Sequence, residues 1–250
     1  SIKLNTMKKL LFTLLILTLY SCGSKGNKLI DDSDEDKEYI ENLLGTIYYK
    51  GSLFSGTLTK HYEDGQLEYK NNYKSGKNDG LSESYYEDGQ LYEKRTYKNG
   101  VYDGLYEQYF KDGQLYEKTT YKDDEYDGLY EEYYKDGQLF KKITYKNGNR
   151  DGLNEQYFED GQLYEKTTIK NGEYDGLSEK YYKDGQLYEK RTYKNGEYDG
   201  LHEKYYTDGQ LEFKRYWKDG KNDGVFERYY TDGQLDWKRT YKDGRIVNEE

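Results

Sequence analysis

The stretch YYKDGQLYEKRTYKNGEYDGL, residues 181–201, contains the pattern that decides the fold. Its DGQL tetrapeptide occurs eight times at intervals of 24 residues, beginning at Asp64, Asp88, Asp112, Asp136, Asp160, Asp184, Asp208 and Asp232. A period of this length is typical of stacked repeats, in which each unit buries its apolar groups against its neighbours. The sequence therefore predicts an elongated repeat protein without a thick central core.

Each repeat contains two turn signals between strand-like runs. Asp-Gly, as at Asp112 and Gly113, is a strong signal for a two-residue type I′ hairpin turn, which needs positive φ at both central residues. Lys-Asn-Gly, as in residues 98–100, predicts a second reversal, either a two-residue Asn-Gly turn or a longer loop. Two reversals per repeat give two strands. We therefore expect an all-β, elongated antiparallel meander of 24-residue β-hairpins with about 16 to 18 short strands.

A tight turn at Asp112-Gly113 also predicts which side chains face each other across the hairpin, and such pairs are the unit of sheet stabilisation. Opposite charges and an aromatic residue opposite glycine recur in the other copies, which supports this register. The predicted pairs are Glu107 with Lys118, Gly104 with Tyr121, Phe110 with Leu115, and Tyr109 with Tyr116. Period-2 alternation then predicts one face with Gly104, Phe110, Leu115 and Tyr121, and another with Leu105, Glu107, Tyr109, Tyr116 and Lys118.

The composition separates a folded repeat array from a disordered chain. Charged residues make up 35% and apolar residues 33%, and the net charge is −10, which is typical of disorder. However, the chain has 35 tyrosines that recur at fixed positions, and aromatic residues favour strands. Interleaved charges with an acidic balance lack the concentrated basic face that nucleic acid requires, so we expect no nucleic-acid partner.

The amino terminus resembles a secretion signal. Met7 is the only methionine, and it is followed by two lysines and the apolar run of residues 10–20, which is too short to span a bilayer. We therefore interpret residues 1–21 as a signal peptide, with residues 1–6 as upstream read-through.

Cys22 is the only cysteine, so no intramolecular disulfide can form. The sequence LYSC that ends at Cys22 resembles a bacterial lipobox, which implies a lipidated cysteine and a membrane anchor in the bacterial cell envelope, at the outer membrane or cell surface. We expect residues 22–44 to be the lipidated cysteine and an acidic flexible tether, and residues 45–250 to be a repeat domain of about eight repeats.

The repeat itself resembles the MORN repeat family, and most closely its bacterial variant branch, which includes antitoxin-like proteins. The residues that carry the resemblance are Tyr97, Lys98, Asn99, Gly100, Gly104, Asp112 and Gly113, and the likeness covers residues 45–244. Asp124 departs from the pattern, because it replaces a turn glycine. The resemblance implies an extended, curled antiparallel sheet that acts as a scaffold, a protein-binding module or a lipid-associated module.

A candidate binding stripe consists of aromatic residues that the central repeats carry and the outer repeats lack. Its members are Tyr92, Tyr116, Phe140, Tyr164 and Tyr188 after the DGQL leucine, and Tyr102, Tyr126, Tyr174 and Tyr198 in the following loops. In the outer copies the aromatic moves by one residue, as in Glu212-Phe213, and alternation predicts that it changes face. Such a stripe suits recognition of a protein or glycan. The alternative is that these rings only pack within the sheet and that the outer copies are caps.

We expect no enzyme, no cofactor and no metal. Catalysis needs a convergent, non-repeating set of side chains, whereas the carboxylates recur in every unit and metal-ligand spacing is missing from the sequence. The two histidines, His61 and His202, are interpreted as surface positions that have drifted from the repeat pattern. Three functions stay open at this point: a surface-anchored scaffold that binds another protein, such as a toxin, a cell-wall or glycan binder, and an enzyme of unrecognised type.

Overall fold

The computed structural model describes residues 28–31, 37 and 39–249, so Cys22 and the predicted signal peptide lie outside the described residues. The described chain forms a 19-stranded sheet from β1 and β5–β22, and a separate three-stranded sheet from β2–β4. The strands are β1 Lys28–Asp31, β2 Ile40–Leu43, β3 Thr46–Tyr49, β4 Ser52–Leu53, β5 Gly56–His61, β6 Leu67–Lys74, β7 Lys77–Tyr85, β8 Leu91–Lys98, β9 Val101–Tyr109, β10 Leu115–Lys122, β11 Glu125–Tyr126, β12 Gly128–Tyr133, β13 Leu139–Lys146, β14 Asn149–Tyr157, β15 Leu163–Lys170, β16 Glu173–Tyr181, β17 Leu187–Lys194, β18 Glu197–Tyr205, β19 Leu211–Lys218, β20 Lys221–Tyr229, β21 Leu235–Lys242 and β22 Arg245–Glu249.

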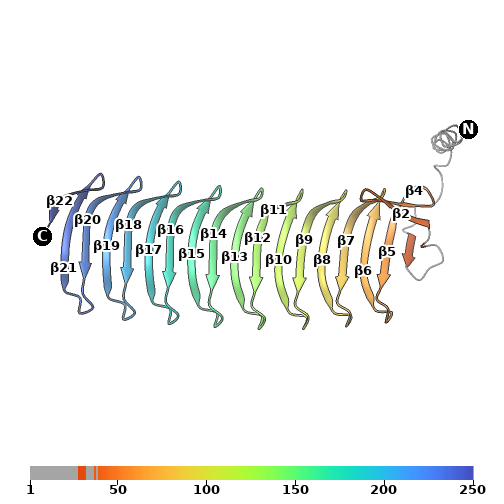
Figure 1. Cartoon of the computed structure of the whole chain (residues 1–250), viewed down its shortest axis with the longest axis horizontal. Helices are drawn as coiled ribbons and strands as arrows, with labels where there is room; N and C mark the ends of the chain where they lie inside the picture. The colour runs from red at the N-terminus through yellow and green to blue at the C-terminus, as the bar shows by residue number, and fades with distance from the viewer. Residues whose placement is uncertain (1–27, 32–36, 38, 250) are drawn as a thin grey trace, which may run out of the picture.

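The large sheet is a meander in which successive strands pair antiparallel, as β8 does with β7 and β9; β11 and β12 both pair with β10. One strand, β1, is added in parallel beside β5. Figure 1 shows the strands in a single row along the long axis, with β1 at one end and β22 at the other. At a strand spacing of about 4.8 Å, the row from β5 to β22 is about 80 Å long. The prediction of an elongated antiparallel hairpin array is confirmed.

The type I′ turns lie at the Asn-Gly ends of the hairpins. Asn99 and Gly100 have φ values of 52° and 90°, and Lys98 pairs directly with Val101 across them. Both central residues therefore have the positive φ that this two-residue turn requires. Of the two alternatives that the sequence left open for Lys-Asn-Gly, the structure contains the two-residue turn.

The Asp-Gly ends have a different turn from the one predicted. The Phe110 N–H donates to the Gln114 carbonyl at 2.8 Å, and the Gly113 N–H donates to the Phe110 carbonyl at 2.9 Å, so the loop contains three residues, 111–113. Gly113 alone takes a positive φ, of 84°, as in a type I turn followed by a left-handed glycine. The Asp112 carboxylate stabilises the loop by accepting the Gln114 N–H at 3.2 Å.

The three-residue loop changes the register at this end of the hairpin. Glu107 pairs with Lys118 and Gly104 with Tyr121, as predicted, but Tyr109 pairs with Leu115. The predicted pairs Phe110 with Leu115 and Tyr109 with Tyr116 are wrong, because a bulge at Tyr116 takes up the extra loop residue. Leu115 consequently lies on the same face as Glu107, and Tyr116 lies on the opposite face with Tyr121, so these two residues exchange the faces that alternation predicted.

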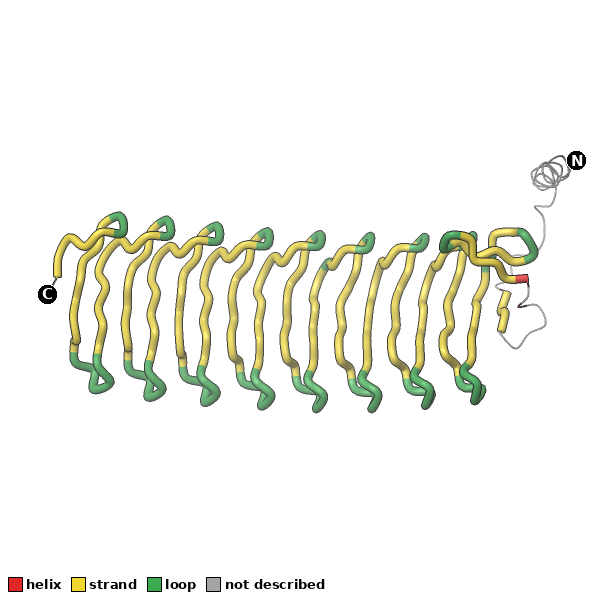
Figure 2. The backbone as a smooth tube through the Cα atoms, viewed as in Figure 1, coloured by secondary structure: helices red, strands yellow, loops and turns green. Residues whose placement is uncertain are grey.

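A second irregularity bends each hairpin near its type I′ turn, and Figure 2 shows this bend along the upper edge of the array. Between β8 and β9 the register passes from Arg95 opposite Tyr106 to Tyr97 opposite Tyr102, so β9 has extra residues there. Gly104 lies among them with a φ of 127°. This backbone conformation favours glycine, which explains why each repeat has a second glycine four residues after the turn.

In the type I′ turns, the second central residue is glycine in every copy except one, where it is Asp124 with a φ of 67°. Because the left-handed conformation costs a residue with a Cβ about 1 kcal/mol, we expect Asp124→Gly to stabilise the protein by about 0.5–1 kcal/mol. The gain is partly offset, since the Asp124 carboxylate accepts the Tyr102 N–H at 2.7 Å. The measurement is the thermal unfolding midpoint. A lower midpoint in the variant would mean that this hydrogen bond outweighs the turn strain.

The amino-terminal end of the array has a small apolar core. Ile30, Ile47 and Phe54 are buried there and pack together. Residues 28–31 and 40–43, which the sequence assigned to the flexible tether, form strands β1 and β2. β1 is held by parallel pairing with β5 and by burial of Ile30. The sequence contains little periodic signal here, because Leu29 and Ile30 are adjacent apolar residues in a polar segment.

Candidate binding surface

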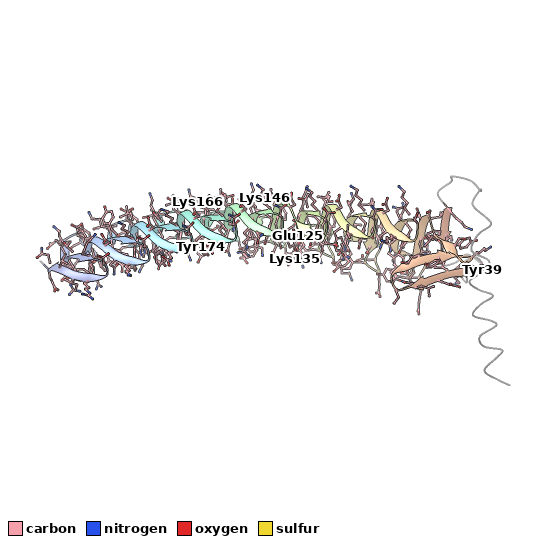
Figure 3. All side chains as sticks on the ribbon, turned by 90° about the horizontal axis from the view of Figure 1, so that it is seen from above. Tyr39, Glu125, Lys135, Lys146, Lys166 and Tyr174 are labelled. Atoms are coloured by element: carbon pink, nitrogen blue, oxygen red, sulfur yellow. The ribbon has the colours of Figure 1, made fainter. Side chains whose placement is uncertain are left out.

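The sheet has two faces that differ in how constant they are from repeat to repeat. The side that contains Leu105, Glu107 and Lys118 is called the outer face. The side that contains Tyr102, Tyr116 and Thr119 is called the inner face. In Figure 3, Lys166 and Tyr174 lie on opposite sides of the ribbon, as their registers require. From β8 onward the buried side chains are on the inner face: Glu93, Thr119, Ile143, Asn154, Thr167, Ile169, Ser178, Glu189 and His202.

The outer face carries a continuous ladder of glutamate and lysine. Each central lysine pairs in register with a glutamate of its own hairpin and with one of the next, as Lys166 does with Glu155 and Glu179. The Lys166 Nζ lies 2.7 Å from a carboxylate oxygen of Glu179. The predicted Glu–Lys pairing is therefore confirmed, and it extends between repeats as well as within them. Such a ladder stabilises stacking and is the same in every copy, so it carries no information about a ligand.

The first part of the predicted stripe forms a row beside the Asp-Gly loops, on the inner face. Each ring of this row packs against the aromatic residue that precedes its loop, with ring centroids 5.0–5.1 Å apart. The row contains Tyr92, Tyr116, Phe140, Tyr164 and Tyr188, and we call it the loop row. Part of its contact area is therefore used for packing within the repeat.

The partner rings of the loop row also join successive repeats. The Tyr134 hydroxyl donates to the Tyr157 carbonyl at 2.9 Å, and Tyr86, Tyr182 and Tyr206 make the equivalent bond. Phe110 and Phe158 occupy the same position without a hydroxyl.

We therefore expect Tyr134→Phe to destabilise the protein by about 1 kcal/mol and Phe158→Tyr to stabilise it by a similar or smaller amount, because a net hydrogen bond contributes about that much. The two variants are matched opposites and can be compared by denaturant unfolding. Equal midpoints for both would contradict a stabilising role of this inter-repeat bond.

The second part of the predicted stripe lies at the other end of the strands, in a row beside the type I′ turns. Here tyrosines stack from strand to strand: the ring centroids of Tyr102 and Tyr121 are 5.3 Å apart, and those of Tyr121 and Tyr126 are 4.7 Å apart. We call these rings the turn row; its members are Tyr97, Tyr102, Tyr121, Tyr126, Tyr145, Tyr174, Tyr193, Tyr198 and Trp217. The loop row and the turn row share one face but are about 15 Å apart, because about five residues separate them along a strand.

The predicted change of face in the outer copies is wrong. Phe213 pairs with Lys204 across β18 and β19, at the register position that glutamate or lysine occupies in the central copies, and this position is on the inner face. Glu212 takes the bulge position, and its carboxylate lies 2.9 Å from the ammonium group of Lys204. The same ammonium group lies over the ring of Tyr188, the bulge residue of the preceding repeat. The bulge holds both of its residues on one side of the sheet, so the swap moves the aromatic along the inner face rather than through the sheet.

Between the two aromatic rows lies a belt of residues that differ from copy to copy. The inner-face positions that correspond to Tyr106, Gln108 and Thr119 in the other repeats are called the variable belt. Their occupants are Ser82, Tyr106, Tyr130, Asn154, Ser178, His202 and Phe226; Ser84, Gln108, Glu132, Gln156, Lys180, Lys204 and Arg228; and Asn71, Arg95, Thr119, Ile143, Thr167, Arg191, Arg215 and Arg239. By contrast, the outer-face glutamate, lysine and tyrosine positions of the same hairpins keep one residue type throughout. The sequence contained this signal, but reading it requires knowing which positions share a face.

His202 belongs to the variable belt, and only 2% of its surface is exposed, so its interpretation as a drifted surface position is wrong. The Arg215 Nε donates to His202 Nδ1 at 3.1 Å, which leaves the ring proton on Nε2, 2.8 Å from Glu189. Burial lowers the pKa of His202. Although burial opposes it, hydrogen bonds from His202 and Arg191 lower the pKa of Glu189. The result is a satisfied Glu–His–Arg network. His61 is half-buried, and its Nδ1 lies 3.3 Å from Asp31.

Within the described residues, no three side chains of histidine, cysteine, aspartate or glutamate converge as metal ligands. The same part of the chain contains no helix with the length and apolarity needed to cross a bilayer.

The single row of hairpins and its broad inner face define a β-hairpin repeat protein whose functional candidate is an extended surface. A family model described as the MORN repeat variant matches eight segments: 55–75, 78–99, 102–123, 126–147, 150–171, 174–195, 198–220 and 222–243. The chain belongs to this MORN repeat variant family, whose repeats indicate a binding or scaffold role.

A comparison with curated protein sequences gave no match. Among solved structures, the crystal structure of TcdB2-TccC3-Cdc42 is similar at 14% identity with a TM-score of 0.21, over 76% of this chain. The crystal structure of TcdB2-TccC3 is similar at 12% identity with the same TM-score and the same coverage. This chain spans 12% and 13% of those two chains.

Proposed function

We propose that this chain is a non-catalytic scaffold that binds another protein along its inner face. The observation that carries the proposal is the contrast between the two faces: the outer face keeps its glutamate, lysine and tyrosine positions, while each copy has a different combination of residues at the three belt positions. Residues that only stack repeats have no reason to vary, because every repeat has the same neighbours. A partner protein that is not itself repetitive presents different chemical groups to each copy, so a surface that recognises it must vary from copy to copy.

The form of the inner face favours an extended segment of the partner. The belt runs along the array between two aromatic rows, and tyrosine offers a large apolar ring with a polar tip, which suits protein interfaces. The belt also carries charged side chains, and the carboxylate of its member Glu132 lies 2.6 Å from the ammonium group of Lys141 on the next strand. A non-catalytic role is supported by the buried state of His202, whose ring nitrogens are both engaged by Glu189 and Arg215.

The contact with a partner can be mapped by a photo-crosslinking amino acid. When the photo-crosslinking amino acid replaces Tyr126 or Tyr198 on the inner face, we expect it to crosslink one partner protein in extracts of the source cells. Placed at Tyr133 on the outer face, it serves as the matched control. Crosslinking of the same protein with equal yield from both faces would contradict the proposal.

We further propose that Cys22 carries the lipid anchor and holds the protein in the bacterial cell envelope. The support is the signal-like run of residues 10–20 followed by the LYSC sequence. Because β1 begins six residues after Cys22 and lies at one end of the row, the anchor would hold the array by its amino-terminal end. Labelling with radioactive palmitate is expected in the wild type, and label that survives Cys22→Ala would exclude this anchor.

The partner that we propose is a protein toxin, with this chain as its antitoxin or immunity-like protein. The support is the likeness to the antitoxin-like branch of the family, and the inner face would be the surface that covers the toxin. Co-expression with the product of a neighbouring toxin gene should restore growth. Rescue that persists when Tyr126 and Tyr198 are both changed to alanine would separate any antitoxin activity from the inner face.

A further inference from the structure

The variable belt contains one stretch of small side chains in the middle of the array. Ile143, Asn154, Thr167 and Ser178 lie in register on the four successive strands β13–β16. The flanking members of the same line are larger, Tyr130 on one side and Arg191 on the other. The small residues therefore form a sunken floor on the inner face.

The turn row is interrupted beside this floor. Arg150 and Ile169 stand where neighbouring repeats have tyrosines, and Tyr174 resumes the row on β16. The result is a cavity of about 190 Å³, whose lining includes Ile143, Arg150, Asn154, Thr167, Ile169 and Tyr174 as well as two carboxylate residues, Glu155 and Glu165. The cavity is therefore smaller than the usual pocket for a drug-sized molecule.

Two polar atoms on the floor have no protein partner. The Asn154 Oδ1 and the Thr167 Oγ1 are both buried without a hydrogen bond, and the residues are only 8% and 7% exposed. The two residues lie directly opposite each other. In the first repeats Asn71 and Ser82, which occupy the register positions of Thr167 and Ser178, are joined by a hydrogen bond from the Ser82 hydroxyl to the Asn71 amide oxygen. A ligand with several hydroxyl groups would satisfy both atoms, because a hydroxyl both donates and accepts.

The walls combine apolar surface with one unpaired cation. Lys141 is paired with Glu132 at 2.6 Å, and Glu165 with Lys180 at 3.7 Å. Within the described residues, no carboxylate pairs with Arg150, which is exposed at the rim. A guanidinium group binds a carboxylate with two parallel hydrogen bonds. Ile143, Ile169 and the Tyr174 ring supply an apolar surface for the C–H groups of a ring.

From these observations we propose that the cavity binds a single sugar residue that carries a carboxylate. The hydroxyls of the sugar bind Asn154 and Thr167, its carboxylate binds Arg150, and its ring packs against Tyr174. The inference goes beyond the proposed protein-binding function and does not depend on it, since the site is confined to strands β13–β16 of a longer face.

The test is titration of the full-length protein with methyl β-glucuronide and with methyl β-glucoside, followed by NMR. We expect saturable binding of the glucuronide, about tenfold tighter than that of the glucoside, because only the former supplies a partner for Arg150. Thr167→Val should weaken glucuronide binding about fivefold or more through loss of one hydrogen bond. Thr119→Val, the same change at the same register position two repeats earlier, should leave it unchanged.

A second variant keeps the test independent of folding. The double change Arg150→Tyr and Ile169→Tyr restores the residues that other repeats carry at these positions, so it should fold and close the gap in the turn row. It is expected to abolish glucuronide binding. The proposal is overturned if neither sugar binds, if both bind with equal affinity, or if the restored array still binds the glucuronide.

Discussion

Replacement of Gly152 by alanine is expected to destabilise the protein by about 3 kcal/mol. Gly152 has a φ of 135°, and an added Cβ would lie 2.9 Å from the Thr144 Cβ on the preceding strand. The variant therefore combines a backbone conformation that L-residues rarely adopt with a steric clash against a β-branched side chain. Denaturant unfolding followed by circular dichroism measures the loss.

Gly172→Ala is the matched control, in the type I′ turn of the same repeat. Gly172 also has a positive φ, of 86°, but no atom lies within 4 Å of its added Cβ. Its cost should be only about 1 kcal/mol, that of the left-handed conformation. Equal losses in the two variants would mean that the bend at Gly152 is not sterically required. Because repeat arrays can unfold in parts, the comparison should use both the midpoint and the slope of the transition.

The second large effect is unfolding in alkali, with loss of the sheet between about pH 10 and pH 12. Burial, together with neighbouring tyrosine or glutamate groups, raises the pKa of Tyr102, Tyr109, Tyr133 and Tyr205 to about 12. The folded protein thus holds these protons more tightly than the unfolded chain, in which the pKa is about 10. Their contribution to stability is complete below pH 10 and is lost as the pH rises to 12.

The measurement is circular dichroism against pH, together with the absorbance of ionised tyrosine. We expect ionisation and loss of strand signal to occur together. Tyr109→Phe removes one hydroxyl group with a raised pKa, together with its hydrogen bond to Glu107 at 3.1 Å. The variant should keep the fold and lose less stability between about pH 10 and pH 12 than the wild type. Ionisation of most tyrosines near pH 10 with an intact sheet would contradict the expected burial of these hydroxyls.

The middle of each hairpin was predictable from residue types alone. Glu107 opposite Lys118 and Gly104 opposite Tyr121 follow from charge and size complementarity, which a linear pattern records. The loop ends were not predictable in the same way, because Asp-Gly is compatible with both a two-residue and a three-residue turn. The single extra residue is absorbed by the bulge at Tyr116, and this reversed the faces assigned to Leu115 and Tyr116.

The candidate surface was predictable only in part. The aromatic positions stood out because they recur, but their separation into a loop row and a turn row depends on which strand end each occupies. The variable belt and the cavity at Asn154 and Thr167 were missed, since residues such as Ile143 and Asn154 are 11 apart in the chain and meet only through strand pairing.

The sequence by itself determined the repeat length, the number of hairpins and the all-β class of this protein, because glycine turns and alternating strands are local properties. Only the tertiary structure decided which residues share the inner face. That choice depends on the bulges at Tyr116 and near Gly104, where backbone hydrogen bonding and steric fit between neighbouring strands set the register. A bulge changes the face of the side chains between it and the loop, so one local adjustment decides which surface a partner can meet.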